Sequence, residues 1–169
     1  ISYEGKTTTQ AITVKPNPIL KIEIKQAPTK VNYVEGQDFD PKGMIVEATY
    51  ENGMVKKVED YIIRGGEDLQ KDQTTVTIVY EELTTTQAIT VVAKTVTSIK
   101  VKKMPTKTEY LQNKEELDLT GGIIEIIYND NTKEDMSMEL KDITVSGFNN
   151  TKVGKNTILV KLLEEHFSH

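Results

Sequence analysis

Thr-Thr-Thr-Gln-Ala-Ile-Thr-Val stands at residues 7–14 and again, unchanged, at residues 84–91. The residues before it repeat as well, because 11 of 14 positions are identical when residues 1–14 are aligned with residues 78–91. A match of this length does not arise from composition, so the chain consists of tandem repeats. The shift of 77 residues is longer than the period of solenoid repeats, which is roughly 20–50 residues. Each unit is therefore long enough to bury a core of its own.

Composition and charge limit what these units can do. The 169 residues include 21 basic and 26 acidic side chains, which gives a net charge of −5. Nucleic-acid-binding domains normally present clustered positive charge, so binding to DNA or RNA is disfavoured. The sequence has no cysteine, which excludes thiol catalysis and cysteine-ligated zinc. No apolar run approaches the roughly 20 residues of a membrane-spanning helix.

Apolar and polar residues alternate with period two along most of each unit, which is the pattern of half-buried β-strands. One alternating run ends at Asn52-Gly53, where we predict a type I′ hairpin turn, since that turn needs positive φ at two successive residues. No segment of useful length has a helical period with capping residues. About seven short strands per unit, with turn signals every 8–12 residues, predict an all-β fold of tandem Ig-like sandwiches arranged end to end.

Strand alternation and the equivalence of the two units together select the side chains that should face each core. The predicted inward residues of the first unit are Ile22, Ile24, Val46, Ala48, Tyr50, Val76, Ile78 and Tyr80. Those of the second unit are Ile99, Val101, Ile124, Ile126, Tyr128, Ile158 and Val160. The two sets have matching spacing, so we expect the two units to fold alike.

The repeat divides the chain into three parts. Residues 1–16 are interpreted as the terminal hairpin of a preceding repeat, with Thr7–Val14 as its returning strand, and residues 17–94 as one Ig-like repeat. Residues 95–169 are interpreted as a repeat that lacks its final strand, since no counterpart of residues 84–91 follows Leu162. The connection Val92–Thr97 has no glycine or proline. We therefore expect the last strand of one unit to pass almost directly into the first strand of the next.

Several motifs recur in both units and together cover essentially the whole chain. They are Pro-Thr-Lys followed by Tyr (residues 28–33 and 105–110), Phe/Leu-Asp-x-x-Gly (39–43 and 117–121), the Tyr-x-Asn-Gly hairpin (50–53) and the closing Tyr-Glu-x-x-Thr-Thr-Thr strand. As a set they resemble the bacterial Ig-like domain repeats of group 3. The second unit departs from the pattern by having Asp130-Asn131 in place of Asn-Gly.

The resemblance implies a setting as well as a fold. Such repeats are strung along large secreted or cell-wall-anchored surface proteins, often of Gram-positive bacteria. They serve there as stalks, spacers or adhesive modules beside other domains. The resemblance implies no catalytic residues, so none are carried over to this chain.

One acidic cluster could bind a metal ion. Glu35, Asp38 and Asp40 are close in sequence and could gather around Ca²⁺, but their spacing is not that of an EF-hand loop. The same region of the second unit contains Asn113, Glu115 and Asp118. We interpret both regions as solvated loops, with calcium binding as the alternative.

The two histidines, His166 and His169, are interpreted as part of a tail. They lack a third ligand for zinc, and no other histidine can be the base of a Ser-His-Asp triad. The Asn149-Asn150-Thr151 run fits an N-glycosylation acceptor, which means little in a bacterial setting. We predict no catalytic residues, no cofactor and no metal site, and the ligand-binding residues, if there are any, remain unknown.

Lysines on the outer strands raise two further hypotheses. A Lys–Asn isopeptide cross-link needs a buried lysine, whereas Lys21, Lys25, Lys100 and Lys102 fall on the polar phase of their strands. The run Lys100, Lys102, Lys103 and Lys107, with a thinner version in Lys21, Lys25 and Lys30, could meet an anionic polymer or glycan. We favour a solvated face, since charge on an outer strand also blocks aggregation at sheet edges.

Six tyrosines could form a platform for stacking sugars, but they fall on the apolar phase and recur between units. They are Tyr3, Tyr33, Tyr50, Tyr80, Tyr110 and Tyr128. We interpret them as core rings whose hydroxyl groups have hydrogen-bond partners.

These observations favour non-enzymatic, structural repeats that project a functional module of a bacterial surface or secreted protein. The alternative is an adhesive module that binds a host protein or glycan, and an enzyme ranks third because no nucleophile–base pair is found. The expected partners are neighbouring domains of a larger protein, without nucleic acid or membrane insertion. A strand-exchange contact between copies is also predicted, because Thr7–Val14 matches the strand that the second unit lacks.

Overall fold

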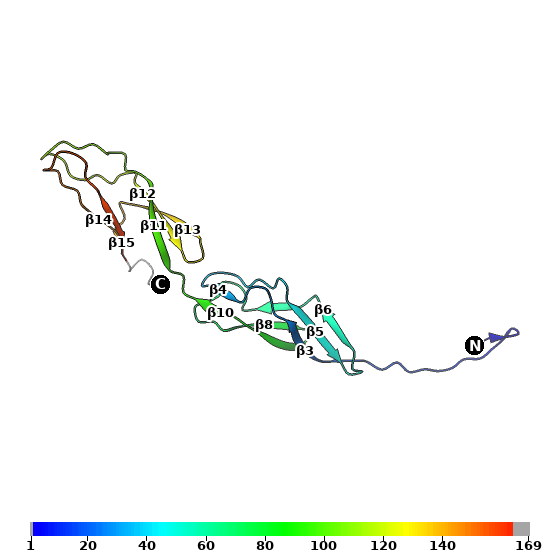
Figure 1. Cartoon of the computed structure of the whole chain (residues 1–169). Helices are drawn as coiled ribbons and strands as arrows, with labels where there is room; N and C mark the ends of the chain where they lie inside the picture. The colour runs from blue at the N-terminus through cyan, green and yellow to red at the C-terminus, as the bar shows by residue number, and fades with distance from the viewer. Residues whose placement is uncertain (1, 164–169) are drawn as a thin grey trace. The chain divides into compact units, whose positions relative to one another are not determined.

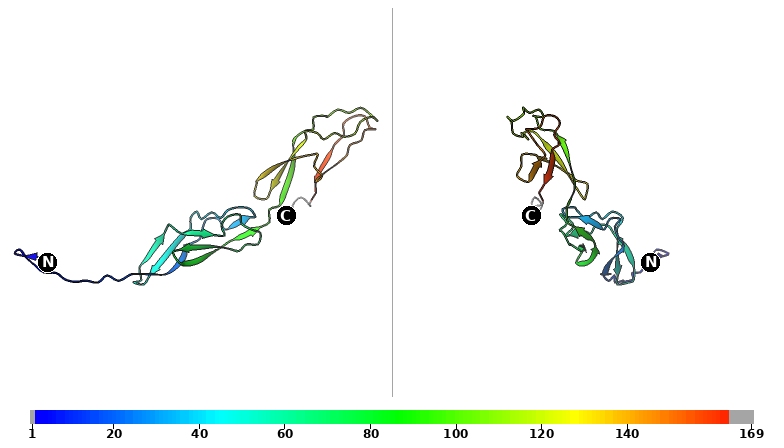
Figure 2. Two further views of the ribbon diagram at one scale, coloured as in Figure 1. Left: turned by 180° about the vertical axis from the view of Figure 1, so that it is seen from behind. Right: turned by 60° about the vertical axis from the view of Figure 1, so that its left-hand side comes forward.

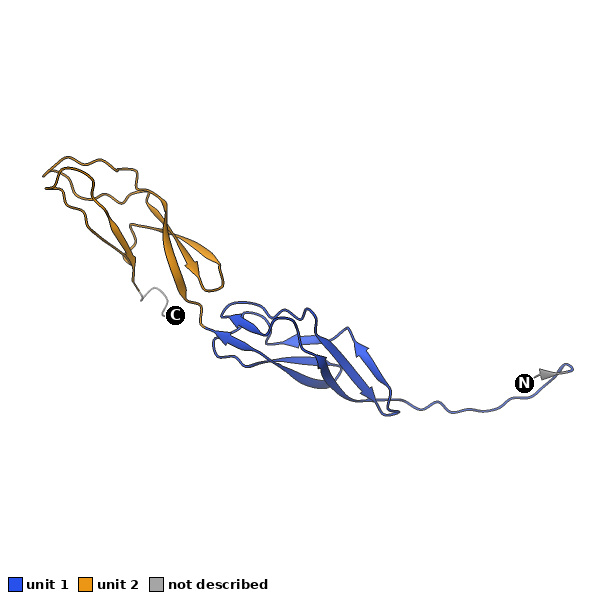
Figure 3. Cartoon of the chain, viewed as in Figure 1, with its two compact units in different colours: residues 1–92 blue, residues 93–169 orange. Residues whose placement is uncertain are grey.

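The computed structural model describes residues 2–163, and these residues form β-strands joined by turns and loops. The chain divides into two compact units, unit 1 (Ile1–Val92) and unit 2 (Ala93–His169) (Figure 3). Three residues, Ala93, Lys94 and Thr95, lie between the last strand of unit 1 and the first strand of unit 2. The described residues contain no helix that is long and apolar enough to cross a membrane.

Unit 1 contains two three-stranded antiparallel sheets (Figure 1). The first has the order β3 (Ile19–Gln26), β5 (Ile45–Tyr50) and β6 (Val55–Val58). The second has the order β7 (Ile62–Arg64), β8 (Thr75–Tyr80) and β9 (Leu83–Ala88). In the first sheet Ile22 lies opposite Ala48, and both side chains are buried, which is the result that strand alternation predicts.

The closing segment of unit 1, residues 83–92, takes part in two sheets in turn. Its first part is β9, which pairs with β8, and its second part is β10 (Thr90–Val92), which pairs in parallel with β4 (Asn32–Val34). The side chains of Gln87, Ile89 and Val91 are buried. This one segment therefore closes unit 1 by adding both ladder hydrogen bonds and core side chains.

Side chains from both sheets of unit 1 pack into a single core. Its buried members are Ile22, Tyr33, Phe39, Met44, Val46, Ala48, Val58, Leu69, Val76, Ile78, Ile89 and Val91. The predicted inward set of unit 1 is confirmed, because five of its residues are in this core and Ile24, Tyr50 and Tyr80 pack against it partly buried.

The turn between β5 and β6 is not the predicted type I′ turn. Gly53 has a positive φ of 80°, but Asn52 is not among the residues with positive φ. The N–H of Gly53 donates to the carbonyl of Tyr50, and the N–H of Tyr50 donates to the carbonyl of Met54. This is a three-residue loop with glycine in the left-handed position, as in a type I turn with a G1 bulge. Asn-Gly suits both turns, so the dipeptide alone cannot distinguish them.

Unit 2 repeats the first sheet and part of the second (Figure 1). The first sheet has the order β11 (Val96–Lys103), β12 (Ile123–Tyr128) and β13 (Lys133–Ser137), and β14 (Ile143–Ser146) pairs with β15 (Leu159–Leu162). Ile99 lies opposite Ile126, just as Ile22 lies opposite Ala48 in unit 1. Asn131, with a φ of 64°, takes the turn position of Gly53. The two units therefore share strand register as well as sequence.

The core of unit 2 is smaller than that of unit 1. Its buried members are Ile124, Ile126, Tyr128, Met136, Met138 and Ile143, and Ile99 and Val160 pack against it partly buried. The Tyr128 hydroxyl donates to the Glu134 carboxylate at 2.6 Å. Burial, followed by this hydrogen bond, raises the pKa of Tyr128 to about 12, so the hydroxyl remains protonated at neutral pH.

Two residues of the predicted inward set of unit 2 are not part of its core, because Ile158 is only half-buried and is not among the side chains that pack against the core, and Val101 is not buried. Val101 pairs with Ile124 in the ladder, yet its side chain is 50% exposed. Its counterpart Ile24 in unit 1 packs against the core, where β9 lies against β3. The inward direction is therefore right, but within the described part of unit 2 no strand takes the place of β9 to cover Val101.

The amino-terminal segment also differs from the prediction. β1 (Ser2–Tyr3) and β2 (Lys6–Thr7) form a short hairpin, but no strand is assigned between residue 8 and Ile19. The side chains of Ile12 and Val14 are 82% and 87% exposed. The predicted returning strand Thr7–Val14 is thus formed only at Thr7, because a single hairpin without a sheet to pack on is marginal in water.

A tyrosine holds the same loop in both units. In unit 1 the Tyr33 hydroxyl donates to the Lys30 carbonyl and accepts from the Asp40 N–H. In unit 2 the Tyr110 hydroxyl donates to the Lys107 carbonyl and accepts from the Asp118 N–H. These hydroxyl groups have partners, as predicted for core tyrosines, and each ties together two backbone segments that frame the loop.

The lysine of this loop pairs with an amide in unit 1 and with a carboxylate in unit 2. Lys30 Nζ donates to Gln37 Oε1 at 2.9 Å, and Lys107 Nζ donates to Glu115 Oε1 at 2.6 Å. Glu115 also accepts from the Leu111 N–H. The hydrogen bond from Lys107, followed by that from Leu111, lowers the pKa of Glu115, and the bond to Glu115 raises the pKa of Lys107.

Truncation of the two cores should act on each unit separately. We expect Ile78→Ala and Ile124→Ala each to cost about 2–5 kcal/mol of unfolding free energy, because a buried branched side chain is lost. Calorimetry should show Ile78→Ala lowering the transition of unit 1 and Ile124→Ala lowering that of unit 2. Val101→Ala is the control and should cost less, since its side chain is half exposed. A loss below about 0.5 kcal/mol for either core variant would contradict the assigned core faces.

The Lys107–Glu115 pair should make unit 2 sensitive to acid. Because folding lowers the pKa of Glu115, its contribution is present above the unfolded pKa and is lost as the pH falls through the folded pKa. Glu115→Gln installs the residue that unit 1 has at Gln37. We expect the parent chain to have the higher melting temperature for unit 2 at pH 7, and the difference to shrink as the pH falls below the usual pKa of a glutamate and through the lowered folded pKa of Glu115. A difference that is independent of pH would show that the charge of Glu115 contributes nothing.

Candidate functional site

The most distinctive surface of unit 2 is an open groove at the place that residues 83–92 fill in unit 1. In unit 1 that segment pairs with β8 on one side and β4 on the other. In unit 2 the corresponding neighbours are β15 and residues 109–111, and the described residues of unit 2 include no strand between them. We call this the closing-strand groove. The backbone of these two segments therefore borders the groove, and no strand among the described residues joins them.

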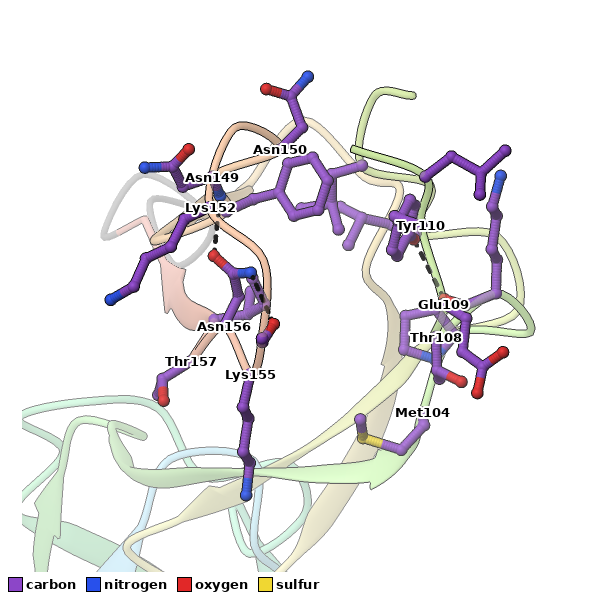
Figure 4. A pocket seen from close by; sticks show the side chains of 18 of the residues that line it. Met104, Thr108, Glu109, Tyr110, Asn149, Asn150, Lys152, Lys155, Asn156 and Thr157 are labelled. Atoms are coloured by element: carbon purple, nitrogen blue, oxygen red, sulfur yellow. Dashed lines mark hydrogen bonds between the residues drawn. The ribbon is translucent and has the colours of Figure 1, made fainter. Parts of the chain in front are cut away.

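The closing-strand groove is a cavity of about 880 Å³ with a largely apolar lining. Its apolar walls include Val101, Leu117, Leu119, Phe148, Ile158 and Val160. Figure 4 shows Glu109 and Tyr110 on one side of the opening, with Asn156 and Thr157 on the other. Tyr110 and Phe148 pack edge to face, with ring centroids 4.9 Å apart. These two rings form part of the apolar wall of the groove.

Side chains along the groove are more exposed than their counterparts in unit 1. Val76 and Ile78 are fully buried, whereas the corresponding Ile158 and Val160 are only half-buried. At the rim, Met104, Leu111 and Val153 are exposed. A patch of exposed apolar side chains beside a strand edge that no described strand covers is a feature of an interaction surface.

One rim of the groove is organised by asparagines. The N–H of Asn149 donates to Asn156 Oδ1 at 3.1 Å, and Asn156 Nδ2 donates to the Gly154 carbonyl at 3.4 Å (Figure 4). Asn149 Oδ1 accepts from the Thr151 N–H, and Asn150 Nδ2 donates to the Glu115 carbonyl. The run with the N-glycosylation pattern is thus part of a turn, in which the Asn149 side chain caps the backbone.

The acidic residues weighed as calcium ligands hold loops instead of forming a cluster. Asp38 accepts from the Asp68 N–H, and Asp40 accepts from the Lys42 N–H. In unit 2 Asp118 accepts from the Thr120 N–H, and hydrogen bonds to Thr120 lower its pKa. Within residues 2–163 no group of three or more metal-binding side chains comes together.

The outer-strand lysines are exposed, and two of the run at residues 100–107 pair with carboxylates. Lys21, Lys25, Lys100 and Lys102 are all exposed, which is the outward orientation predicted for them. Lys102 contacts Asp135 at 2.6 Å, as Lys107 contacts Glu115. These ion pairs reduce the positive potential that an anionic polymer would meet. His166 and His169 lie outside the described residues.

Sequence reasoning predicted a second repeat without its final strand, but it did not predict the groove that the described residues of unit 2 line. Met104, Leu111 and Val153 were not singled out, because none belongs to an alternating run of apolar residues. The one available signal was the identity of residues 7–14 and 84–91, which indicates that unit 2 has a place for the same strand.

Comparisons with known proteins agree with this architecture. The chain is 24% identical to the pectate lyase L of Thermoclostridium stercorarium over an alignment of 169 positions, which covers 88% of this chain and 13% of that protein. The chain thus spans about one-eighth of the length of this relative. The family model described as bacterial Ig-like domain (group 3) matches the chain twice in tandem, at residues 26–91 and 104–168. These two matches include most of the chain, which therefore belongs to the bacterial Ig-like domain (group 3) family.

Proposed function

We propose that this chain is a non-catalytic spacer region of a larger extracellular bacterial protein, either secreted or anchored to the cell wall of a Gram-positive bacterium. Its partners are then the neighbouring domains of the same protein. The observation that carries the proposal is the tandem repetition of one Ig-like unit. Each of the two units has its own core, and the three residues from Ala93 to Thr95 join them.

Two further observations support a spacer. Two lysines of the run at residues 100–107, Lys102 and Lys107, form ion pairs, and the loop carboxylates of Asp38 and Asp40 accept backbone hydrogen bonds, which reduces the charge that the described surface offers to a polymeric ligand. The match to the pectate lyase L covers 13% of that protein, so the similarity concerns a small part of a much longer chain. A spacer region beside a functional module fits both.

The adhesive alternative and the enzyme alternative can be separated by binding and activity measurements. We expect no saturable binding of the 169-residue chain to a glycan array, to host matrix proteins or to polygalacturonate, because the loop carboxylates and the rim asparagines already hold backbone groups of the protein. We also expect no lyase activity after chromatographic purification. A known carbohydrate-binding module and an active pectate lyase serve as positive controls. Saturable binding to one class of ligand would replace the spacer with an adhesive module, and activity that co-purifies with the chain would indicate an enzyme.

A further inference from the structure

We propose that unit 2 holds the connector, residues Ala93–Thr95, as part of its own fold, and that Ala93 is the single hinge residue of the chain between the two units. The proposal concerns the covalent connection and does not depend on the spacer function. It rests on contacts that bind the connector to the turn between β12 and β13, and on the equivalent contacts of unit 1.

Both units hold the chain that enters them at the same turn. β3 starts beside the turn between β5 and β6, and β11 starts beside the turn between β12 and β13 (Figure 2). In unit 1 the N–H of Glu51 donates to the Pro18 carbonyl at 3.0 Å. In unit 2 the N–H of Asn129, the residue equivalent to Glu51, donates to the Thr95 carbonyl at 2.9 Å. This main-chain bond is therefore a property of the repeat.

Unit 2 adds the side chain of Asn129 to this bond. Its Oδ1 accepts from the Thr95 N–H at 3.1 Å, and its Nδ2 donates to the Ala93 carbonyl at 2.9 Å. One amide group thus pairs with the backbone on both sides of Lys94. Unit 1 cannot form the same arrangement, because Pro18 stands at the position of Thr95 and proline has no N–H to donate.

The lysine of the connector makes two further contacts with unit 2. Lys94 Nζ lies 4.5 Å from the centroid of the Tyr128 ring and 3.9 Å from Asp130 Oδ2. The Asp130 side chain is only 4% exposed, and a cation this close to the face of a ring is attracted to it. In unit 1 the equivalent ring, that of Tyr50, has Lys56 of β6 at 5.6 Å. The cation over this tyrosine thus comes from a neighbouring strand in unit 1 and from the connector in unit 2.

Two successive carbonyl groups are held by different units where the connector begins. The Val92 carbonyl accepts from the Glu35 N–H of unit 1 at 2.9 Å, and the Ala93 carbonyl accepts from Asn129 of unit 2. A peptide group is planar, so a held carbonyl orients its whole peptide plane. Only the φ and ψ angles of Ala93 lie between these two planes. The rotational freedom of the connection is therefore confined to one residue.

This arrangement makes the hinge depend on the folding of unit 2. Tyr128 ends β12, and Asn129 and Asp130 lie in the turn that follows it. Opening of this hairpin would therefore release Lys94 and Thr95 together. The connection then changes from one hinge residue to a flexible segment of three.

Limited proteolysis of the full chain tests the anchoring by Asn129. Trypsin cleaves after Lys94 only when the connector leaves unit 2, so the rate follows the population of the open form. Asn129→Ala removes both side-chain bonds and should speed this cleavage roughly ten-fold, as expected for two lost hydrogen bonds. Asn150→Ala is the matched control, because Asn150 also donates from a turn to a distant backbone carbonyl, that of Glu115. We expect the control to cleave after Lys94 at the parent rate. No acceleration in Asn129→Ala, or equal acceleration in both variants, would overturn the anchoring.

A second variant separates the two bonds of Asn129. In Asn129→Asp the carboxylate can still accept from the Thr95 N–H, but it has no N–H to donate to the Ala93 carbonyl. Amide exchange of Thr95, followed by NMR, should stay as slow as in the parent chain for Asn129→Asp and become faster for Asn129→Ala. Exchange at one common rate in all three chains would show that Asn129 does not hold the connector.

Spin labels test the hinge itself. The sequence has no cysteine, so Lys71→Cys in unit 1 and Lys141→Cys in unit 2, both at exposed positions, can be labelled specifically. Ala93→Gly should widen the distribution of distances between the labels, because glycine has access to more φ and ψ angles. Thr95→Gly is the control and should leave the width unchanged, since Asn129 holds both the N–H and the carbonyl of Thr95. Equal widths for the two glycine variants would exclude Ala93 as the single hinge.

Discussion

Hydrogen bonds from the Thr90 N–H to the Val31 carbonyl and from the Glu35 N–H to the Val92 carbonyl hold β10 parallel to β4 in unit 1. The same segment carries Ile89 and Val91 into the core. An antiparallel ladder with β8 and a parallel ladder with β4 are thus joined by one continuous piece of backbone. Both halves of the sandwich depend on it, because a thin β domain without disulfides is stabilised by packing and ladder bonds alone.

In unit 2 the described residues include no counterpart of this segment, yet much of the architecture is the same. Its first sheet keeps the register of unit 1, and its tyrosine loop keeps the same hydrogen bonds. Side chains of unit 2 whose counterparts in unit 1 lie beside residues 83–92, such as Val101 and Val160, are more exposed than those counterparts. The fold is therefore built from local hairpins and loops that form their own contacts, and the closing segment adds the burial that completes the core.

The strand faces could be predicted from sequence because they rest on two independent signals, alternation and repetition. Ile22, Val46 and Ile78 are buried as the alternation predicts. The details that failed depend on what lies opposite a residue. Val101 has the right phase, but no strand among residues 2–163 covers it, and Thr7–Val14 has strand-forming residues, but only Thr7 pairs within the described part of the chain. Alternation reports which way a side chain points, whereas burial also requires a neighbouring element.

The groove could not be predicted from the sequence either, because it too depends on which elements lie next to one another. Its lining comes from strands and loops that are distant in the sequence, among them Val101, Phe148 and Ile158. None of these residues carries a chemical signature, since an apolar side chain in a groove has the same sequence pattern as one in a core. The type of turn at Asn52-Gly53 could not be predicted either, because the dipeptide requires a positive φ but does not set the length of the loop.

The parallel pairing of β10 with β4 also determines how unit 1 responds to tension. A chain that enters at Ile19 and leaves after Val92 is loaded at opposite ends of the unit. Pulling on Val92 along β10 then drives that strand lengthwise past β4, and the bonds from Thr90 and Glu35 lie across the line of force. Such bonds share the load and must break together, whereas bonds in a hairpin that is peeled open break one at a time. The strand that completes the core is thereby also the mechanical clamp of the unit.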